Sequence, residues 1–503
     1  MENRQYNLDY LNKPKLDQNL EIIAKELRKK KKDDFINQKR VISTFSQEPT
    51  KERSSLLSSI IPDYANSKEP SAICTKFIEM LIKNQLNPTR EVKCAIMWYI
   101  ATNLMGNLCY DIQFNKSLTE IGIIDYIAKT AFSDGLEYEE YCLTIINNLC
   151  SIYAKACRVT IESDLLIILA SRLNPPFGPT SYIYFQIFGN IASNGINERD
   201  KVIQMGIVDY MKNTLFLKDI DARIIREITF CMFNLLLYKP YPPDKQINDI
   251  VQFSCRTLLT EDKEIVLNSL AVICTVAVIG KSFLGEVLTN GIMQAIVKLF
   301  ESPDEQISKK AIEVVHNICC FTVSEVQICL ESNALKKLLK ILVTSHNEEL
   351  KSLIISAIDS ITVEAAFSEF IYSQDTYEVL VKMFLSLEPI SFRDGIIIAI
   401  CHGILQATDE IMVKICTGDC IDCIIESLRT NAMNNKKSQI VLKCINRMVV
   451  ESKDESIKQA FKCKGGYEEL LRYQYFPDVS VFSIAKDILD KEDQSKLSTK
   501  TLL

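Results

Sequence analysis

Residues 230–237 read FCMFNLLL, an apolar stretch with a single asparagine, Asn234, at its centre. Three earlier stretches have the same character: WYIATNLMGN at 98–107, TIINNLCS at 144–151 and QIFGNIAS at 186–193. Their asparagines are Asn103, Asn148 and Asn190, so the four asparagines are separated by 45, 42 and 44 residues. A pattern that returns at roughly 40–47 residues is typical of large helical repeats.

The same period continues toward the C-terminus. It predicts eight marked helices, the later four of which are centred on Val276, Asn317, Ser360 and His402. A second pattern precedes several of them, in IGIIDYIAKTAF, MGIVDYMKNTLF, NGIMQAIVKLF and SNALKKLLKIL. Each begins with a small or polar residue and continues with apolar residues three and four apart, as in an amphipathic helix. Periodic sequence extends to about Asp490, which is enough for nine or ten units.

Repeats of this size are typical of armadillo or HEAT units. A single unit cannot bury its apolar face, so the units are expected to stack with one continuous core. We therefore predict an all-α, right-handed superhelical solenoid of about ten armadillo repeats, with a groove suited to extended ligands. An irregular multi-helix globule is the alternative, and it would not explain the regular spacing.

Charge is distributed unevenly along the 503 residues. Residues 1–50 hold 11 Lys and Arg against 8 Asp and Glu, a net charge of +3, and the remainder holds 47 against 56, a net of −9. A basic segment beside an acidic body indicates a charged partner for each, or a contact between them. The acidic body gives no reason to expect nucleic-acid binding.

Eighteen cysteines occur without a recognisable signal peptide, since the N-terminus MENRQYNLDY is polar. Most of them lie among apolar neighbours, where a free thiol behaves as a small hydrophobic group. The sequence contains no run of 18 apolar residues, so no membrane-spanning helix is expected. These features predict a soluble intracellular protein without a membrane partner.

The chain divides by composition into four segments. Residues 1–45 form a flexible basic N-terminal segment, 46–70 a Ser-, Glu- and Lys-rich linker, 71–490 the solenoid and 491–503 a polar tail. The most basic window is 25–40, with eight Lys or Arg against three acids. Such a window is often only a solvated helix face, or a nuclear-localisation signal in its own right.

Three stretches together resemble the importin α (karyopherin α) family. ELRKKKKDD at 26–34, followed by KRV at 39–41, is similar to that family's importin-β-binding segment. NLLLYKPYPP at 234–243 is similar to the family's fourth repeat, and CKGGYE at 463–468 to the opening of its last repeat. The resemblance covers nearly the whole chain.

The resemblance implies a nuclear import adaptor that shuttles between cytoplasm and nucleus. Its groove would bind basic nuclear-localisation-signal peptides of cargo proteins, and its basic segment would bind importin β, or fold back into the groove. A nuclear export receptor and nuclear pore proteins are further implied partners. The residues expected to bind importin β are Arg28, Lys29, Lys30, Lys31, Lys32, Lys39 and Arg40.

Asparagine amides carry both a donor and an acceptor, so an asparagine in each repeat could hold an extended peptide backbone. In the family, a tryptophan stands four residues before each asparagine and binds the stems of Lys and Arg. Here only Tyr99 and Phe230 keep a ring at that position, and Trp98 is one residue out of phase. The predicted peptide-binding residues are Asn103, Asn148, Asn190, Asn234, Asn317, Phe230 and Tyr99.

Plainer alternatives remain open for these residues. The asparagines could be surface or capping residues, and the two rings ordinary core aromatics. The lost tryptophan column also leaves open a different function, an armadillo scaffold for cytoskeletal or signalling partners that does not bind classical nuclear-localisation signals.

Cys416, Cys420 and Cys423 form a C-x3-C-x2-C pattern that would suit zinc only with a fourth ligand at suitable spacing. None follows, and Cys401 or His402 could complete a site only if the fold brought them close, so core thiols are expected. With three histidines, no phosphate-binding loop and no nucleophile motif, we predict no enzyme activity, no metal and no cofactor.

Overall fold

The computed structural model describes residues 50–62, 64–83, 88–105, 111–175, 177–214, 217, 220–386, 390–416, 418–429 and 435–500. Across these ranges the regular structure is helical and no strand occurs. The predicted all-α class is confirmed. The basic segment 1–45 lies outside the described residues.

The described residues form two compact units, which are considered separately. The N-terminal unit extends to Val276 and the C-terminal unit begins at Ala277. The division falls near the end of one helix, α16 (Lys263–Ile279).

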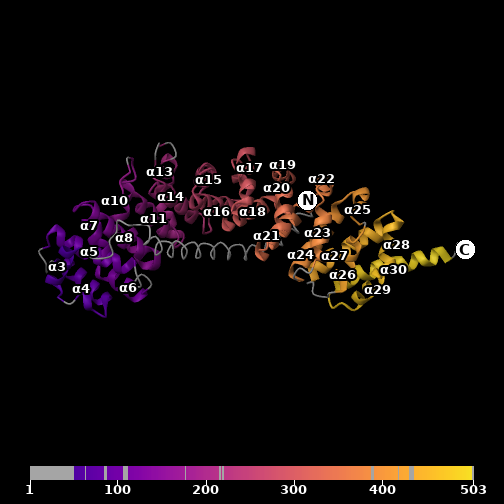
Figure 1. Ribbon diagram of the computed structural model, residues 1–503, viewed down its shortest axis with the longest axis horizontal. Coiled ribbons are helices and arrows are strands. Elements are labelled where there is room, and N and C mark those ends of the chain that lie inside the picture. Colours follow the sequence, from indigo (N-terminus) through magenta and orange to yellow (C-terminus); the bar gives the residue numbers. More distant parts are fainter. Residues whose placement is uncertain are drawn as a thin grey trace. The chain divides into compact units, whose positions relative to one another are not determined.

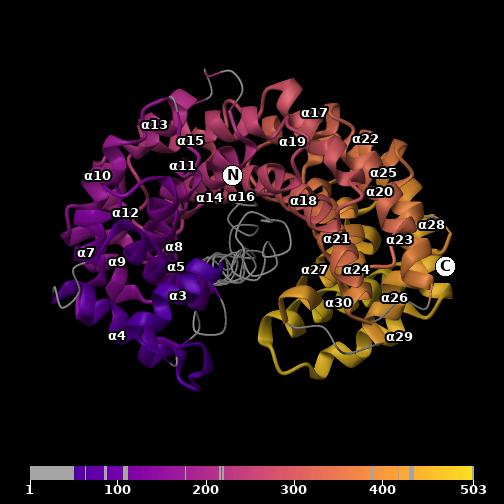
Figure 2. The ribbon, with the colours of Figure 1, turned by 60° about the vertical axis from the view of Figure 1, so that its left-hand side comes forward.

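In the N-terminal unit, one row of helices packs in sequence order along one side, here called the inner row (Figure 2). It consists of α3 (Lys51–Ile60), α5 (Arg90–Met105), α8 (Leu136–Ile152), α11 (Ser181–Ala192), α14 (Ala222–Leu235) and α16. The outer helices are α4 (Pro70–Ile82), α6 (Ile112–Ile121), α7 (Ile123–Thr130), α9 (Ala154–Glu162), α10 (Leu165–Ser171), α12 (Ile196–Gln204), α13 (Ile207–Thr214) and α15 (Asp244–Thr257) (Figure 1).

The C-terminal unit repeats this arrangement. Its inner row consists of α18 (Glu305–Cys319), α21 (Glu348–Thr362), α24 (Ile390–Gln406), α27 (Asn435–Asn446) and α30 (Val479–Lys500). Its outer helices are α17 (Asn290–Lys298), α19 (Val323–Glu331), α20 (Ala334–Thr344), α22 (Ser368–Ser373), α23 (Thr376–Leu385), α25 (Asp409–Ile415), α26 (Cys420–Arg429), α28 (Glu455–Cys463) and α29 (Gly466–Leu470). A short π-helix, η7 (Arg447–Glu451), continues α27.

All eight marked helices predicted from the asparagine period are inner helices. The period is therefore the repeat of the stack. One inner helix, α3, lies inside residues 46–70, which composition had assigned to a linker. Thr50 caps it by accepting a hydrogen bond from the Arg53 amide, and Leu57 is fully buried. Similarly, α30 continues to Lys500, into the predicted polar tail. The four segment boundaries themselves stay predictions.

Side-chain caps begin many of these helices. Asp111, Asp221, Asp304 and Asn347 each accept a backbone N–H hydrogen bond from the first turn of the helix that follows. Such caps satisfy amides that would otherwise have no partner and contribute about 1 kcal/mol each. Gly122, with φ of 92°, makes the turn between α6 and α7. Local chemistry thus fixes where one helix of a repeat ends and the next begins.

Helices α11 and α14 pack closely against each other. A Cβ atom on Gly189 of α11 would lie 2.9 Å from Cδ1 of Phe230 and 3.3 Å from the Cα of Cys231, both on α14. Glycine is therefore the residue that lets these two inner helices approach. No helix in the described part of the chain is long and apolar enough to span a bilayer.

Candidate functional site

Two of the predicted peptide-binding amides connect neighbouring inner helices. Asn148 Nδ2 donates to the Leu104 carbonyl of α5 at 3.4 Å. Asn190 Nδ2 donates to Asn147 of α8, at 2.9 Å to its Oδ1. Both asparagines are buried. In this geometry their donors are used within the stack, and their contact with a peptide stays a prediction.

The other predicted asparagines differ from one another. Half-buried Asn103 donates to the Tyr99 carbonyl of its own helix at 2.7 Å, and Asn317 is buried in α18. Asn234 is only 1% exposed, and its Nδ2 has no hydrogen-bond partner among the described residues. A buried donor without a partner costs about 1–3 kcal/mol, so it calls for a physical explanation.

A second unsatisfied group lies on the adjacent helix. Gln186 of α11 is buried, and its Oε1 accepts no hydrogen bond from any described residue. Gln186 stands four residues before Asn190, at one of the positions where the sequence keeps no ring. Together, Asn234 and Gln186 place one unused donor and one unused acceptor, counted among the described residues, on the adjacent inner helices α14 and α11. A peptide backbone, which carries both N–H and C=O groups, has the chemistry to satisfy both.

The two predicted aromatic contacts lie in the core packing of the N-terminal unit. The Tyr99 ring meets Tyr64 and Phe77 edge to face, with centroids 5.5 and 5.7 Å away. Phe230 is 1% exposed and lies against Gly189. This placement is the core alternative that the sequence left open, and a role for either ring in peptide binding stays a prediction.

The inner row also carries a cluster that the sequence did not reveal, here called the Arg53 cluster. It contains Arg53 of α3, Trp98 of α5, and Glu137 and Tyr141 of α8. The Arg53 guanidinium carbon lies 5.7 Å from the centroids of both rings and its Nη2 pairs with Glu137. Tyr141 donates its hydroxyl hydrogen to Glu137 Oε1 at 2.7 Å. Although burial acts to raise the pKa of Glu137, Tyr141 and Arg53 outweigh it and hold that pKa below its usual range.

Farther along the same row lies the Arg223 cluster. It contains Glu140 of α8, Tyr182 of α11, Arg223 of α14 and Asp221, the residue that caps α14. Arg223 Cζ stands 5.0 Å from the Tyr182 centroid, and Nη2 lies 2.6 Å from Asp221 Oδ2. Burial raises the pKa of Glu140, although the Arg223 charge opposes that rise. Each cluster thus combines an aromatic face, a carboxylate and a guanidinium belonging to the chain itself.

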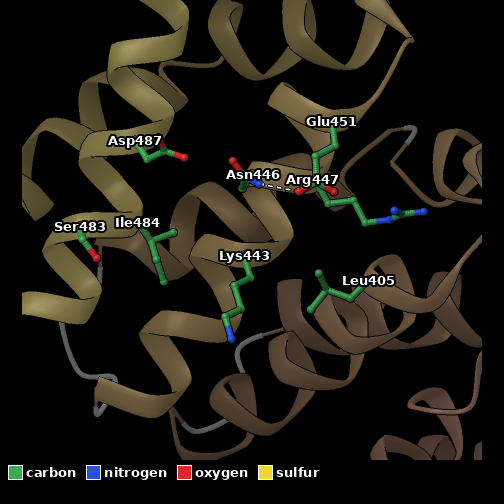
Figure 3. A pocket seen from close by; sticks show the side chains of 8 residues that line it. All are labelled: Leu405, Lys443, Asn446, Arg447, Glu451, Ser483, Ile484 and Asp487. Atoms are coloured by element: carbon green, nitrogen blue, oxygen red, sulfur yellow. Dashed lines mark hydrogen bonds between the residues drawn. The ribbon is translucent and has the colours of Figure 1, made fainter. Parts of the chain in front are cut away.

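The C-terminal unit contains a pocket of about 630 Å³ beside the π-helix (Figure 3). Arg447 Nη2 donates to the Ala407 carbonyl at 2.6 Å, and Asn446 Nδ2 donates to Glu451 Oε1 at 2.7 Å. The pocket is lined by Leu405, Lys443, Asn446, Arg447, Glu451, Ser483, Ile484 and Asp487. Two cations and two acids line it, so its charge favours neither an anionic nor a cationic ligand.

Two histidines of the C-terminal unit link successive inner helices, as the asparagines do in the N-terminal unit. His316 Nδ1 of α18 lies 3.2 Å from Ser360 Oγ of α21, and His402 Nδ1 of α24 lies 2.6 Å from Asp359 Oδ1 of α21. Burial lowers the pKa of His316, against the charges of Asp359 and Glu313. At His402 burial also acts to lower the pKa, but the Asp359 carboxylate outweighs it and the pKa is raised.

Because the chain contains three histidines, the titration of each ring can be followed separately by NMR. We expect His402 to titrate above the ordinary value of about 6.5 and His316 below it. Asp359→Asn should move both midpoints down, because that carboxylate favours the charged form of both rings. A surface control, Glu410→Gln, should move neither. Midpoints that stay in place in Asp359→Asn would contradict the His402–Asp359 pairing.

The sign of the linked stability effect follows from these shifts. The His402–Asp359 pair stabilises the fold fully below the unfolded-state pKa of about 6.5, and that contribution is lost as the pH rises through the higher folded-state pKa. His316 acts oppositely, since its stabilisation is lost as the pH falls below about 6.5.

Cys416, Cys420 and Cys423 are all buried as free thiols. Burial raises the pKa of Cys416 and of Cys423 to about 12. No group of three or more His, Cys, Asp or Glu residues in the described ranges is arranged to hold a metal ion. The residues predicted to bind importin β, Arg28 to Lys32 with Lys39 and Arg40, lie outside the described residues.

Stacked inner and outer helices at this period make the chain an all-α armadillo-repeat solenoid. No family model matches it. Over 206 residues it is 21% identical to importin subunit alpha-1b of Oryza sativa subsp. japonica, a match that spans 41% of this chain and 38% of that relative.

Among solved structures, the chain is similar to an engineered protein, with a TM-score of 0.69 and 18% identity over 82% of this chain and 98% of the other. A designed armadillo repeat protein matches 47% of this chain and 99% of its own, with a TM-score of 0.42 and 19% identity. The first of these likenesses concerns the fold alone.

Proposed function

We propose that this armadillo-repeat protein is a nuclear import adaptor of the importin α type. In this proposal the inner row binds an extended basic peptide of a cargo protein, and the segment with Arg28–Lys32 and Lys39–Arg40 binds importin β. The adaptor shuttles between cytoplasm and nucleus, where an export receptor and nuclear pore proteins are its further partners. The similarity to a rice importin α subunit and the ELRKKKKDD stretch support this proposal.

The observation that carries the peptide-binding part is the unsatisfied pair on α11 and α14. Among the described residues, Asn234 Nδ2 has no acceptor and Gln186 Oε1 has no donor. The two side chains are buried, so in this proposal each turns toward the peptide on binding. A bound backbone carbonyl and a bound backbone N–H would then remove both penalties, each about 1–3 kcal/mol. An extended strand suits this pair, because its polar groups are not already used in internal hydrogen bonds.

Carboxylates elsewhere on the inner row support a cationic peptide. Glu137 and Glu140 of α8 and Glu227 of α14 lie on the same inner row. Opposite charges across an interface favour encounter and register, and their contribution weakens as salt rises. We therefore expect affinity for basic peptides to fall between low and physiological salt.

The test is a titration of the full chain with a fluorescein-labelled peptide that carries one cluster of Lys and Arg. Asn234→Ala and Gln186→Ala should each weaken binding about 5- to 30-fold, since a lost hydrogen bond of this kind is worth about 1–2 kcal/mol. Gln204→Ala on outer helix α12 is the matched control and should leave the affinity unchanged. Because Asn234→Ala also removes an unsatisfied donor, loss of binding should not be accompanied by a comparable loss of stability.

One observation favours a second function, an armadillo scaffold for cytoskeletal or signalling partners. Asn148 and Asn190 donate hydrogen bonds from their side-chain amides to the neighbouring inner helices. If the asparagines only connect one repeat to the next, few amide groups are left to bind a basic peptide. Absence of measurable binding at low salt in the titration above would leave the scaffold as the better description.

A further inference from the structure

An arginine of the chain occupies a site built for a cation. Arg53 of α3 lies over Trp98 of α5 and Tyr141 of α8, at 5.7 Å from each centroid, and pairs with Glu137. Its side chain is only 18% exposed, although it carries a full charge. Three successive inner helices therefore contribute to one aromatic and acidic site, and the guanidinium that fills it is internal.

The physical chemistry of this site does not depend on which chain supplies the cation. A guanidinium or ammonium over one aromatic face gains about 0.5–2 kcal/mol, most when it is shielded from water. The carboxylate of Glu137, oriented by the Tyr141 hydroxyl at 2.7 Å, adds a charge-assisted hydrogen bond. A lysine or arginine of a bound peptide would find the same partners if Arg53 were absent.

The arrangement occurs twice on the row. Arg223 lies 5.0 Å over Tyr182 and pairs with Asp221, while the Glu140 charge acts on the same guanidinium. Arg223 is more open than Arg53, with 55% of its side chain exposed. The Arg53 site is the sharper test, because its internal guanidinium is the more deeply buried of the two.

We propose that Arg53 is a specificity-determining residue, which fills the cation site of Trp98, Tyr141 and Glu137 and so excludes the Lys or Arg side chain of a peptide from it. Arg223 acts in the same way at Tyr182. The inference rests on the proposed peptide-binding function. It predicts that the internal arginines occupy some of the sites that the aromatic and acidic residues form. The wild-type inner row then binds the Lys and Arg side chains of a peptide at fewer sites than it would without those arginines.

The direction of the effect distinguishes this role from a structural one. Removing Arg53 should open the site and strengthen binding of the labelled Lys- and Arg-rich peptide, by about 2- to 30-fold from the gain at one aromatic site. If Arg53 only supports the fold, its removal weakens binding or leaves it unchanged. Arg53→Ala and Arg53→Met are both measured in the full chain, because methionine keeps an unbranched apolar stem against the two rings.

Two controls separate the site from a general change in charge. Arg429→Ala removes an arginine that pairs with Glu469 at 3.0 Å on outer helix α26, and it should not strengthen binding. Adding Glu137→Gln to Arg53→Ala should abolish most of the gain, because the incoming cation then lacks its carboxylate. Circular dichroism checks that each variant is folded.

The outcomes are separable. Binding that is equal or weaker in both Arg53 variants overturns this inference while the peptide-binding function stands. A gain of the same size in Arg429→Ala, or one that persists without Glu137, also overturns it. Absence of peptide binding in the wild type and in all variants at low salt overturns the proposed function itself.

Discussion

Replacing Phe230 by alanine should lower the free energy of unfolding of the N-terminal unit by about 3–5 kcal/mol, the usual cost of deleting a buried phenylalanine ring. Phe230 is 1% exposed and fills the contact between α14 and Gly189 of α11. No side chain on Gly189 can expand into the cavity. The neighbouring helices are therefore expected to collapse only in part, and the cost should be near the upper end of the range.

Urea unfolding followed by circular dichroism measures this change as a shift of the unfolding midpoint. Phe230→Leu is the matched control and should cost less than about 2 kcal/mol, because most of the apolar volume remains. The sequence had offered Phe230 as a peptide contact with a core role as the alternative. A loss below about 1 kcal/mol together with a large loss of peptide affinity would show that the ring serves the peptide and not the core.

The repeat could be predicted from the sequence because stacking requires it. Within each unit, successive inner helices pack against one another, so their apolar residues must return at a nearly constant interval. Asn148, Asn190 and Asn234 record that interval directly. The helix α3 was missed because 10 residues of KERSSLLSSI contain few apolar side chains, and their burial comes from helix α5 elsewhere in the sequence.

The direction of individual side chains could not be predicted in the same way. A helix surrounded on nearly all sides, such as α8 or α11, has buried residues at every phase, so periodicity no longer separates the peptide side from the core side. The Arg53 cluster shows the difficulty, since Glu137 lies 84 residues after its partner and the two share no motif. Gln186 could not be predicted as an unsatisfied group, because the sequence does not show whether its amide finds a hydrogen-bond partner in the stack.

The basic segment allows the second prediction with a large effect, the loss of importin β binding on charge reversal. Arg28, Lys30 and Lys32 belong to the ELRKKKKDD stretch that resembles an importin-β-binding segment. Changing all three to glutamate in the full chain should weaken binding at least about 100-fold, because charge-assisted hydrogen bonds of about 1.5–3 kcal/mol each are replaced by repulsion. The measured quantity is the dissociation constant of purified importin β from the surface-immobilised chain.

The matched control reverses three exposed lysines outside that segment, Lys68, Lys116 and Lys453, and so produces the same change in net charge. It should weaken binding only slightly, and more salt should remove the difference from wild type. In the variant of the basic segment, by contrast, the loss should persist at physiological salt, since specific hydrogen bonds and not the general field are removed. Equal losses in the two triple variants would mean that importin β responds to net charge alone, and unchanged binding in both would leave the armadillo scaffold as the better description of this chain.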